Sequence, residues 1–479
     1  MPTLERITTG IERLDGILGG GIPRYSVVFI TGLPGTGKTI LSQQAVFANA
    51  GQGHVGLYLT TVSEPQIKVL RFLQGFTFFR PDLFGTRIIY GDLGGALRKA
   101  GAQGLLKQLD EMVREHHPGL VVIDSFKALR DTIQDPLAFR EFTSDIAVRL
   151  SLWEATSLLV GEYGVEDIRE GAEFAVADGI IYLYGTEEME QQKRFLRVMK
   201  MRGTHYYGGE HFFDINSNGI TVYPRMSAMV TGEYLFPGGR LGSAIEGFTE
   251  MLGGGVFEST STFISGPTGS GKSLVALGFL VEAARKGQPG LLISFEESGE
   301  QIARNSEAFG WNLGDLMRRG LLDVFHVSPS ELNIDRHAFV IKERADRIGA
   351  RVVVIDSISA FEAAVPDPSK YQGYIWAIND YFKRSGVTVF MIVESRGPFE
   401  SLEISSRRVS FVADNIIFLR YVEVGAEIKR VVGVLKMRGS RHDRCLRVLE
   451  IDPPRIAVGQ ALSQAGMPRA AMRARPEAA

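Results

Sequence analysis

Short apolar runs alternate with longer amphipathic stretches through the first half of the chain. The apolar runs lie at residues 26–31, 55–60, 120–123, 157–160 and 179–183, and residues 40–50 carry apolar positions at helical spacing. Near-continuous apolar runs predict strands that are buried on both faces, as in a parallel sheet covered by helices. The pattern therefore predicts an α/β fold with mostly parallel sheets.

Four landmarks occur twice, in the same order and at a nearly constant offset. The pattern G-x-x-x-x-G-K-[ST] occurs at 32–39 and at 266–273, with its lysines Lys38 and Lys272 separated by 234 positions. The other three pairs are the glycine triplets at 19–21 and 253–255, the acids Asp124 and Asp356, and the Lys-Met-Arg-Gly segments at 200–203 and 436–439. We interpret the chain as a tandem duplication of one nucleotide-binding domain.

The predicted boundaries follow from this duplication. The first domain is expected at 1–225 and the second at 241–457, joined by a linker at 226–240 that contains the breakers Pro237-Gly-Gly. Residues 458–479, rich in Ala, Arg, Pro and Gln, are expected to form a flexible tail.

Composition narrows the class of protein. The chain has 479 residues, of which 44% are apolar and 23% charged, and these globular proportions exclude disordered, collagen and coiled-coil classes. Its 53 basic and 55 acidic residues give a net charge of −2, which disfavours nucleic acid or an anionic membrane as the main partner. A single cysteine, no signal-peptide pattern at the start and no apolar run of about 18 residues predict a cytoplasmic protein.

The two phosphate loops predict ATP and Mg²⁺ as ligands. Glycines let successive N–H groups point at phosphate oxygens, each lysine is expected to reach the β- and γ-phosphates, and the hydroxyls of Thr39 and Ser273 are expected to ligate Mg²⁺. Asp124 and Asp356 each end an apolar run, which places a carboxylate at a strand tip near the metal. The alternative is a glycine-rich turn that binds no ligand. The motif occurs twice, each time between a predicted strand and a predicted helix, and this argues against that alternative. The remaining expected ATP-binding residues are Gly35, Thr36, Gly37, Gly269, Ser270 and Gly271.

These motifs resemble the KaiC family of RecA-like ATPases over nearly the whole chain. The resemblance also rests on Ser-Phe-Glu-Glu-Ser at 294–298, on both Asp-Ser pairs, and on Lys-Met-Arg-Gly-Ser-Arg-His-Asp at 436–443. It implies two tandem RecA-like P-loop domains stacked as a two-tier ring, in a homohexamer with ATP between subunits. It further implies ATP hydrolysis, and phosphorylation of the protein's own Ser and Thr by the second domain.

Catalytic carboxylates are expected in the second repeat only. Glu296 and Glu297 stand 24 and 25 residues after the phosphate-loop lysine, where one can orient a water or accept a hydroxyl proton while the other supports it. A solvated acidic pair at a strand end is the alternative. In the first repeat the same offsets fall on Val62 and Ser63, and Glu64 is one position late. The first domain is therefore expected to bind ATP and to hydrolyse it slowly.

The Lys-x-Arg-Gly segments follow apolar strands in both repeats. Alternation along a strand places Lys200 with Arg202, and Lys436 with Arg438, on one face. The resemblance implies that these side chains reach the neighbouring subunit's γ-phosphate. Exposed basic residues on an edge strand are the alternative.

The resemblance also implies a phosphoacceptor. The family's Ser-Thr pair corresponds to Ser410 and Phe411, so phosphorylation is expected at Ser410, with Ser405 or Ser406 as weaker candidates, and not as a two-site cycle. The implied partners are further copies of the chain and a signalling or KaiB-like protein. The short tail argues against a KaiA-type partner.

Two rival functions remain open at this point. A RecA- or RadA-like DNA-directed ATPase has the same fold and predicts affinity for DNA that falls steeply with salt. The other rival function is a scaffold that binds ATP in both domains and hydrolyses it in neither. Val62 and Ser63 favour this function for the first domain alone.

Overall fold

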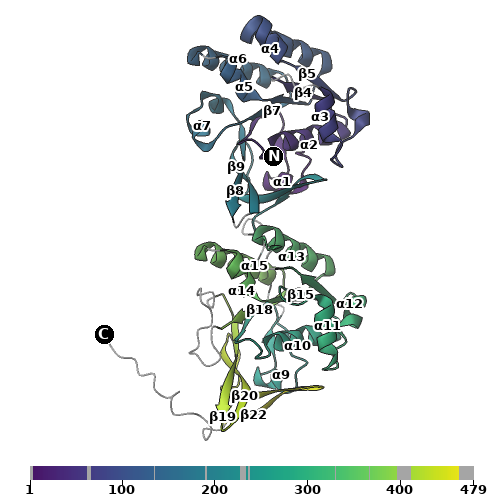
Figure 1. Ribbon diagram of the computed structural model, residues 1–479, viewed down its shortest axis with the longest axis vertical. Helices are drawn as coiled ribbons and strands as arrows, with labels where there is room; N and C mark the ends of the chain where they lie inside the picture. Colours follow the sequence, from purple (N-terminus) through teal and green to yellow (C-terminus); the bar gives the residue numbers. More distant parts are fainter. Residues whose placement is uncertain are drawn as a thin grey trace, which may run out of the picture. The chain divides into compact units, whose positions relative to one another are not determined.

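The computed structural model describes residues 4–61, 66–133, 135–188, 191–226, 233–235, 238–328, 331–365, 367–395 and 412–462. The chain divides into two compact units, residues 1–228 and 229–479. Each unit contains a nine-stranded sheet with helices packed on it, which confirms the predicted α/β class with two tandem domains (Figure 1).

The first unit contains the apolar runs that the sequence singled out as strands. Its strands are β1 (Arg6–Ile7), β2 (Ile22–Pro23), β3 (Val27–Gly32), β4 (Gly56–Thr60), β5 (Ile88–Asp92), β6 (Leu120–Asp124), β7 (Thr156–Gly161), β8 (Gly179–Glu188), β9 (Gln191–Met201), β10 (His211–Asn216) and β11 (Gly219–Tyr223). Its helices are α1 (Glu12–Ile17), α2 (Lys38–Gly51), α3 (Gln66–Leu73), α4 (Gly94–His116), α5 (Phe126–Thr132), α6 (Pro136–Leu152) and α7 (Val165–Glu170), with the short 3₁₀ helices η1 (Pro81–Leu83) and η2 (Ala172–Val176).

The order of strands in the first sheet is β11-β10-β9-β8-β3-β7-β6-β4-β5. Strands β5, β4, β6, β7, β3 and β8 run parallel, whereas β9, β10 and β11 continue the sheet as antiparallel neighbours. The phosphate-loop strand β3 therefore lies between β7 and β8, with the ends of several parallel strands at the same edge. Ligands of open α/β sheets bind at that edge.

Alternating side chains of β3 enter two separate cores, one on each face of the first sheet. Val28 and Ile30 pack with residues of α1, α2 and α3, and Val27 and Phe29 pack with residues of α4, α5 and α6. Figure 1 shows these two groups of helices on opposite faces of the strands. Because both faces are covered, every residue of β3 and of the neighbouring strand β7 is buried, and most of their side chains are apolar.

The second unit repeats this arrangement. Its strands are β12 (Arg240–Leu241), β13 (Val256–Phe257), β14 (Ser261–Gly266), β15 (Gly290–Ser294), β16 (Leu322–His326), β17 (Val352–Asp356), β18 (Thr388–Glu394), β19 (Asn415–Val424), β20 (Glu427–Met437), β21 (Arg447–Asp452) and β22 (Arg455–Ala461). Its helices are α9 (Phe248–Met251), α10 (Lys272–Arg285), α11 (Gly299–Glu307), α12 (Leu313–Arg318), α13 (Ile334–Ile348), α14 (Ile358–Ala364) and α15 (Pro368–Arg384). The sheet order β16-β15-β17-β18-β14-β19-β20-β21-β22 reproduces that of the first unit strand for strand.

Helix starts are repeated with their capping residues. The carboxylate of Asp135 accepts hydrogen bonds from two backbone N–H groups at the start of α6, and Asp367 does the same at the start of α15. In both helices a proline follows the capping acid, where its missing N–H costs nothing. The duplication therefore extends to local helix signals.

The structure bears on one alternative and on one boundary that the sequence suggested. The strands that carry the Lys-x-Arg-Gly segments, β9 and β20, are antiparallel and have a neighbour on each side, but the pairing at Lys200 and at Lys436 is with β8 and with β19 alone. Strand β22 pairs with β21 and ends at Ala461, so ordered structure continues past residue 457, where the sequence placed the start of the tail. Strand β22 has only the short apolar stretch Ile456-Ala457-Val458, which is followed by Gly459 and Gln460, so its end is not marked by the sequence pattern.

Candidate functional site

Each phosphate loop connects a central strand to the helix that follows it, β3 to α2 and β14 to α10. Two glycines in each loop have positive φ angles, +74° and +97° at Gly35 and Gly37, and +75° and +98° at Gly269 and Gly271. Neither helix has a side-chain cap at its start. The first N–H groups of α2 and α10 are therefore available to an anion, as a phosphate-binding loop requires.

The loop lysines lie folded under their own loops. Lys38 donates to the carbonyl of Leu33 at 2.8 Å and Lys272 to that of Pro267 at 2.9 Å. Both are 7% exposed, and burial lowers the pKa of each ammonium group. Nearby carboxylates oppose this shift, which shows that each lysine sits in an acidic environment.

The hydroxyls and acids that were expected to hold Mg²⁺ lie together in both units. Thr39 donates to Oδ2 of Asp124 at 3.0 Å, and Ser273 hydrogen-bonds Asp356. Burial raises the pKa of Asp356 to about 6, and the bond from Ser273 opposes this rise. A hydroxyl beside a carboxylate at the start of a phosphate-binding helix is an oxygen donor set that suits Mg²⁺, so these residues fit the metal.

Glu296 and Glu297 follow strand β15 and are exposed. Glu296 acts electrostatically on both Lys272 and Asp356, raising the pKa of each. Glu297 has a weaker effect on the pKa of Asp356 and accepts a hydrogen bond from the Asn305 amide at 3.3 Å. The structure thus brings both glutamates to the second phosphate loop, with Glu296 the more closely coupled. Their expected counterparts in the first repeat, residues 62–64, lie outside the described residues.

A further carboxylate in each unit was missed by the sequence reading. Glu394, at the end of β18, lies 3.9 Å from the Lys272 ammonium group and accepts a hydrogen bond from the Thr268 hydroxyl at 3.3 Å. Glu162, just after the equivalent strand β7, is the first acid that raises the pKa of Lys38. Each follows an apolar run as Asp124 and Asp356 do, which was the available signal.

The basic residues of the Lys-x-Arg-Gly segments are engaged within their own units. Arg202 lies 3.4 Å from the Asp178 carboxylate and Arg438 lies 3.3 Å from that of Asp414, although both arginines are 63% exposed. Lys436 donates to the carbonyl of Ala413 at 2.6 Å. In Lys200, burial lowers the pKa, and neighbouring Arg202 adds to that effect. The described contacts therefore hold the arginines at exposed positions from which they could reach another molecule.

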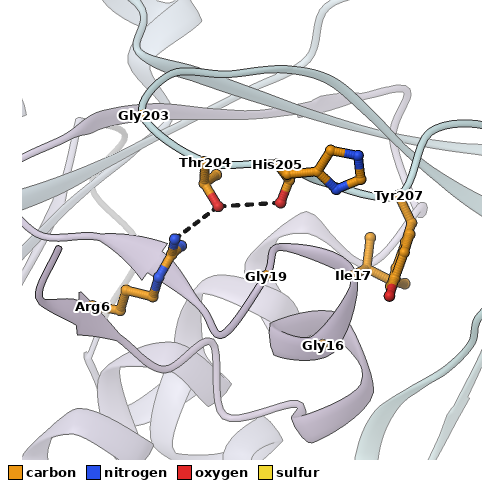
Figure 2. Close-up of a pocket in the computed structure, with 8 residues that line it drawn as sticks. All are labelled: Arg6, Gly16, Ile17, Gly19, Gly203, Thr204, His205 and Tyr207. Atoms are coloured by element: carbon orange, nitrogen blue, oxygen red, sulfur yellow. Dashed lines mark hydrogen bonds between the residues drawn. The ribbon is translucent and has the colours of Figure 1, made fainter. Parts of the chain in front are cut away.

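The glycine triplets and the turns after Lys-x-Arg-Gly pack against each other. In Figure 2 the Arg6 guanidinium points to the Thr204 hydroxyl, at 2.8 Å, and that hydroxyl contacts the His205 carbonyl. A Cβ atom on Gly19 would lie 2.7 Å from that same carbonyl oxygen. The second unit repeats the arrangement, with Arg240 donating to Ser440 at 3.0 Å. Two landmarks of the sequence duplication are therefore the two sides of one contact.

A family model described as "ATPase: KaiC" matches residues 7–227 and 241–463 of the chain. The chain belongs to the KaiC ATPase family. The KaiC resemblance expected from the motifs is thereby confirmed, as are two tandem RecA-like P-loop domains, and membership of this family implies ATP binding.

Curated KaiC proteins match over nearly their whole length. The circadian clock oscillator protein KaiC of Picosynechococcus sp. is 27% identical over 467 residues, covering 95% of this chain and 90% of its own length. That of Thermostichus vulcanus is 29% identical, with 93% and 87% covered. The circadian clock protein KaiC3 of Synechocystis sp. is 28% identical, with 95% and 92% covered.

The described ranges of the KaiC-family chain contain neither a membrane-spanning helix nor a ready-made cluster of metal-ligating side chains. No helix there combines the length and apolarity needed to cross a bilayer. No group of three or more His, Cys, Asp and Glu side chains there is arranged to hold a metal ion. A site for Mg²⁺ in this chain would therefore depend on the loop hydroxyl, the strand-end aspartate and the nucleotide phosphates.

Proposed function

We propose that the protein is a KaiC-like ATP-binding ring protein whose second domain carries out Mg²⁺-dependent ATP hydrolysis and serine autophosphorylation. The observation that carries the proposal is the convergence of Lys272, Ser273, Asp356 and Glu296 at one sheet edge. The first domain of this proposal is residues 1–225, the linker is 226–240, and the second domain begins at 241 and includes β22, which ends at Ala461 and not at 457. Phosphoryl transfer depends mainly on positioning and on charge stabilisation, which these residue types supply.

In the second domain, the loop amides and Lys272 bind the phosphates, while Ser273 and Asp356 hold Mg²⁺, which would neutralise the charge of the phosphate oxygens. Glu296 accepts the proton of the attacking water or serine hydroxyl as the oxygen bonds to the γ-phosphorus and the bond to ADP breaks. The Glu297 carboxylate accepts a hydrogen bond from the Asn305 amide, and its negative charge supports Glu296 in the role of proton acceptor. Exposed Arg438 and half-buried Lys436 serve the neighbouring subunit's γ-phosphate.

In the first domain, the corresponding loop and Asp124 hold Mg²⁺-ATP, with Lys200 and Arg202 in the role of Lys436 and Arg438. Val62 and Ser63 provide no general base at the positions of the glutamate pair. This domain therefore serves mainly to retain ATP and to join subunits. The proposal also includes a ring of six subunits in two tiers and a cytoplasmic location. Its role would be signalling or clock-like regulation, with a KaiB-like protein as partner.

The phosphoacceptor in this proposal is Ser410, which lies outside the described residues together with Phe411, Ser405 and Ser406. Mass spectrometry of the full-length protein incubated with Mg²⁺-ATP tests it, beside measurement of ADP release. Glu296→Gln removes the proton acceptor with little change of shape, Glu297→Gln is its matched neighbour, and Ser410→Ala removes the acceptor hydroxyl.

We expect one phosphate on the original protein and none on Ser410→Ala. We also expect ADP release to fall about 100-fold or more in Glu296→Gln, and to fall less in Glu297→Gln. ADP release without phosphate would restrict the second domain to hydrolysis. ADP release that is unchanged in both glutamine variants would overturn the assignment of the catalytic carboxylates.

A further inference from the structure

A buried tyrosine reaches the acidic residue of the first site. Tyr58 lies in the middle of β4 and is 2% exposed. Its hydroxyl donates to Oδ2 of Asp124 at 2.7 Å, and this oxygen also accepts the bond from Thr39 at 3.0 Å. One carboxylate oxygen is therefore held by two hydroxyl groups that come from different elements, β4 and α2.

The surroundings of Tyr58 keep its hydroxyl in this position. The ring stacks on that of Tyr90, with centroids 5.1 Å apart and planes inclined by 27°. The hydroxyl of Ser42 lies 3.2 Å from that of Tyr58 and donates to the carbonyl of Thr39 at 2.9 Å. The Tyr58 hydroxyl therefore has two oxygen neighbours, the Ser42 hydroxyl and the Asp124 carboxylate. Its strongest available acceptor is the carboxylate.

The second site lacks this arrangement. Leu292 occupies the position of Tyr58, because both pair with the equivalent residues of their neighbouring strands. Ala276 stands where Ser42 stands, four residues after the loop lysine. Both are buried in the apolar core of the second unit. Among the described residues, the hydroxyl groups that the first site has at these two positions are therefore replaced by apolar side chains in the second.

We propose that Tyr58 is a positioning residue of the first ATP site, which fixes the Asp124 carboxylate beside Thr39 so that the pair is prearranged for Mg²⁺ bound with ATP. The inference rests on the proposed function, in which this site holds Mg²⁺-ATP. Hydrogen-bond partners behind metal ligands typically contribute about 10- to 100-fold to metal affinity. An Asp124 carboxylate that is already held in place for Mg²⁺ suits a site whose role is to retain ATP.

The test uses the full-length chain with Lys272→Ala, which silences the second phosphate loop. Binding of radiolabelled ATP is measured by equilibrium dialysis, once with Mg²⁺ and once with EDTA. Tyr58→Phe removes only the hydroxyl and keeps the stacked ring. Tyr90→Phe is the matched control, because its hydroxyl donates to Gln43 and not to the acid.

Tyr58→Phe is expected to lower the affinity for Mg²⁺-ATP about tenfold and to leave the affinity in EDTA within about twofold, while Tyr90→Phe changes neither. An equal loss with Mg²⁺ and with EDTA would assign Tyr58 a packing role and overturn the inference, as would an unchanged affinity. Absence of Mg²⁺-dependent binding in Lys272→Ala itself would overturn the proposed function of the first site, and the inference with it.

Discussion

Replacing Asp356 with Asn is expected to stabilise the nucleotide-free second unit at neutral pH, although it removes the carboxylate proposed to hold Mg²⁺. Burial, together with the negative charges of Glu296 and Glu297, raises the pKa of Asp356 from 3.8 to about 6. An ionised Asp356 is therefore less favourable in the folded chain than in the unfolded one. Asn has nearly the same shape, can accept the bond from Ser273, and carries no charge.

The expected magnitude follows from the shift. About two pKa units at about 1.4 kcal/mol each correspond to a cost of about 3 kcal/mol when the group is fully ionised. Because Asp356 is only partly buried and solvent screens it, about 1–3 kcal/mol is the expected gain for Asp356→Asn. The folded pKa lies above the unfolded one, so the cost is absent below about pH 4, grows between about pH 4 and 6, and is complete above that range.

Scanning calorimetry of the full-length protein in EDTA measures this gain. At about pH 7.5 the transition of the second unit should rise by about 2–4 °C for each kcal/mol, and at about pH 4 the variant and the original protein should unfold together. Asp124→Asn is the control. Its carboxylate accepts from both Thr39 and Tyr58, and a neutral amide oxygen is a weaker acceptor, so this variant should gain nothing.

The reasoning would be refuted by an Asp356→Asn protein that is no more stable than the original at neutral pH. It would also be refuted by a gain of equal size at acidic pH, because that gain could not arise from ionisation.

Two further predictions concern the missed carboxylate and the repeated arginine. Glu394→Gln should raise the affinity of the second site for ATP about threefold, because the carboxylate lies 3.9 Å from Lys272 and competes with phosphate. ATP titration in a Lys38→Ala background measures this, and a lower affinity would show that Glu394 assists binding. Arg240→Ala should destabilise the second unit by about 1–3 kcal/mol, since it loses bonds to the Gly255 carbonyl and the Ser440 hydroxyl. Calorimetry should show the first unit's transition unchanged.

The sequence predicted the phosphate loops and the strands beside them because these are local patterns. Strand β3, the loop glycines and helix α2 follow one another within a short segment, and their chemistry depends on backbone shape. Asp124 could be placed because a strand end is visible as the last residue of an apolar run. Because the chain is a tandem duplication, each of these patterns could be recognised at two places.

Glu394 and Tyr58 could not be placed in the same way. Glu394 ends an apolar run as Asp124 does, but its approach to Lys272 depends on β18 being the neighbour of β14, and no local pattern states which strands are neighbours. Tyr58 lies inside an apolar run, where a tyrosine is an ordinary core residue, and only the pairing of β4 with β6 places Asp124 beside it. Strand order, a long-range property, therefore determined what the sequence reading missed.

The two units share the backbone conformation of the phosphate loop and differ in the side chains around the strand-end aspartate. In the first, hydroxyl donors from Thr39 and Tyr58 satisfy Asp124. In the second, Glu296 and Glu297 add negative charge near Asp356, and the core behind it is apolar. Like charges that lie close together repel one another, and a divalent cation relieves that repulsion. Binding of Mg²⁺ with ATP should therefore change the electrostatic energy of the second site more than that of the first, which is the difference expected between a site that reacts and a site that retains.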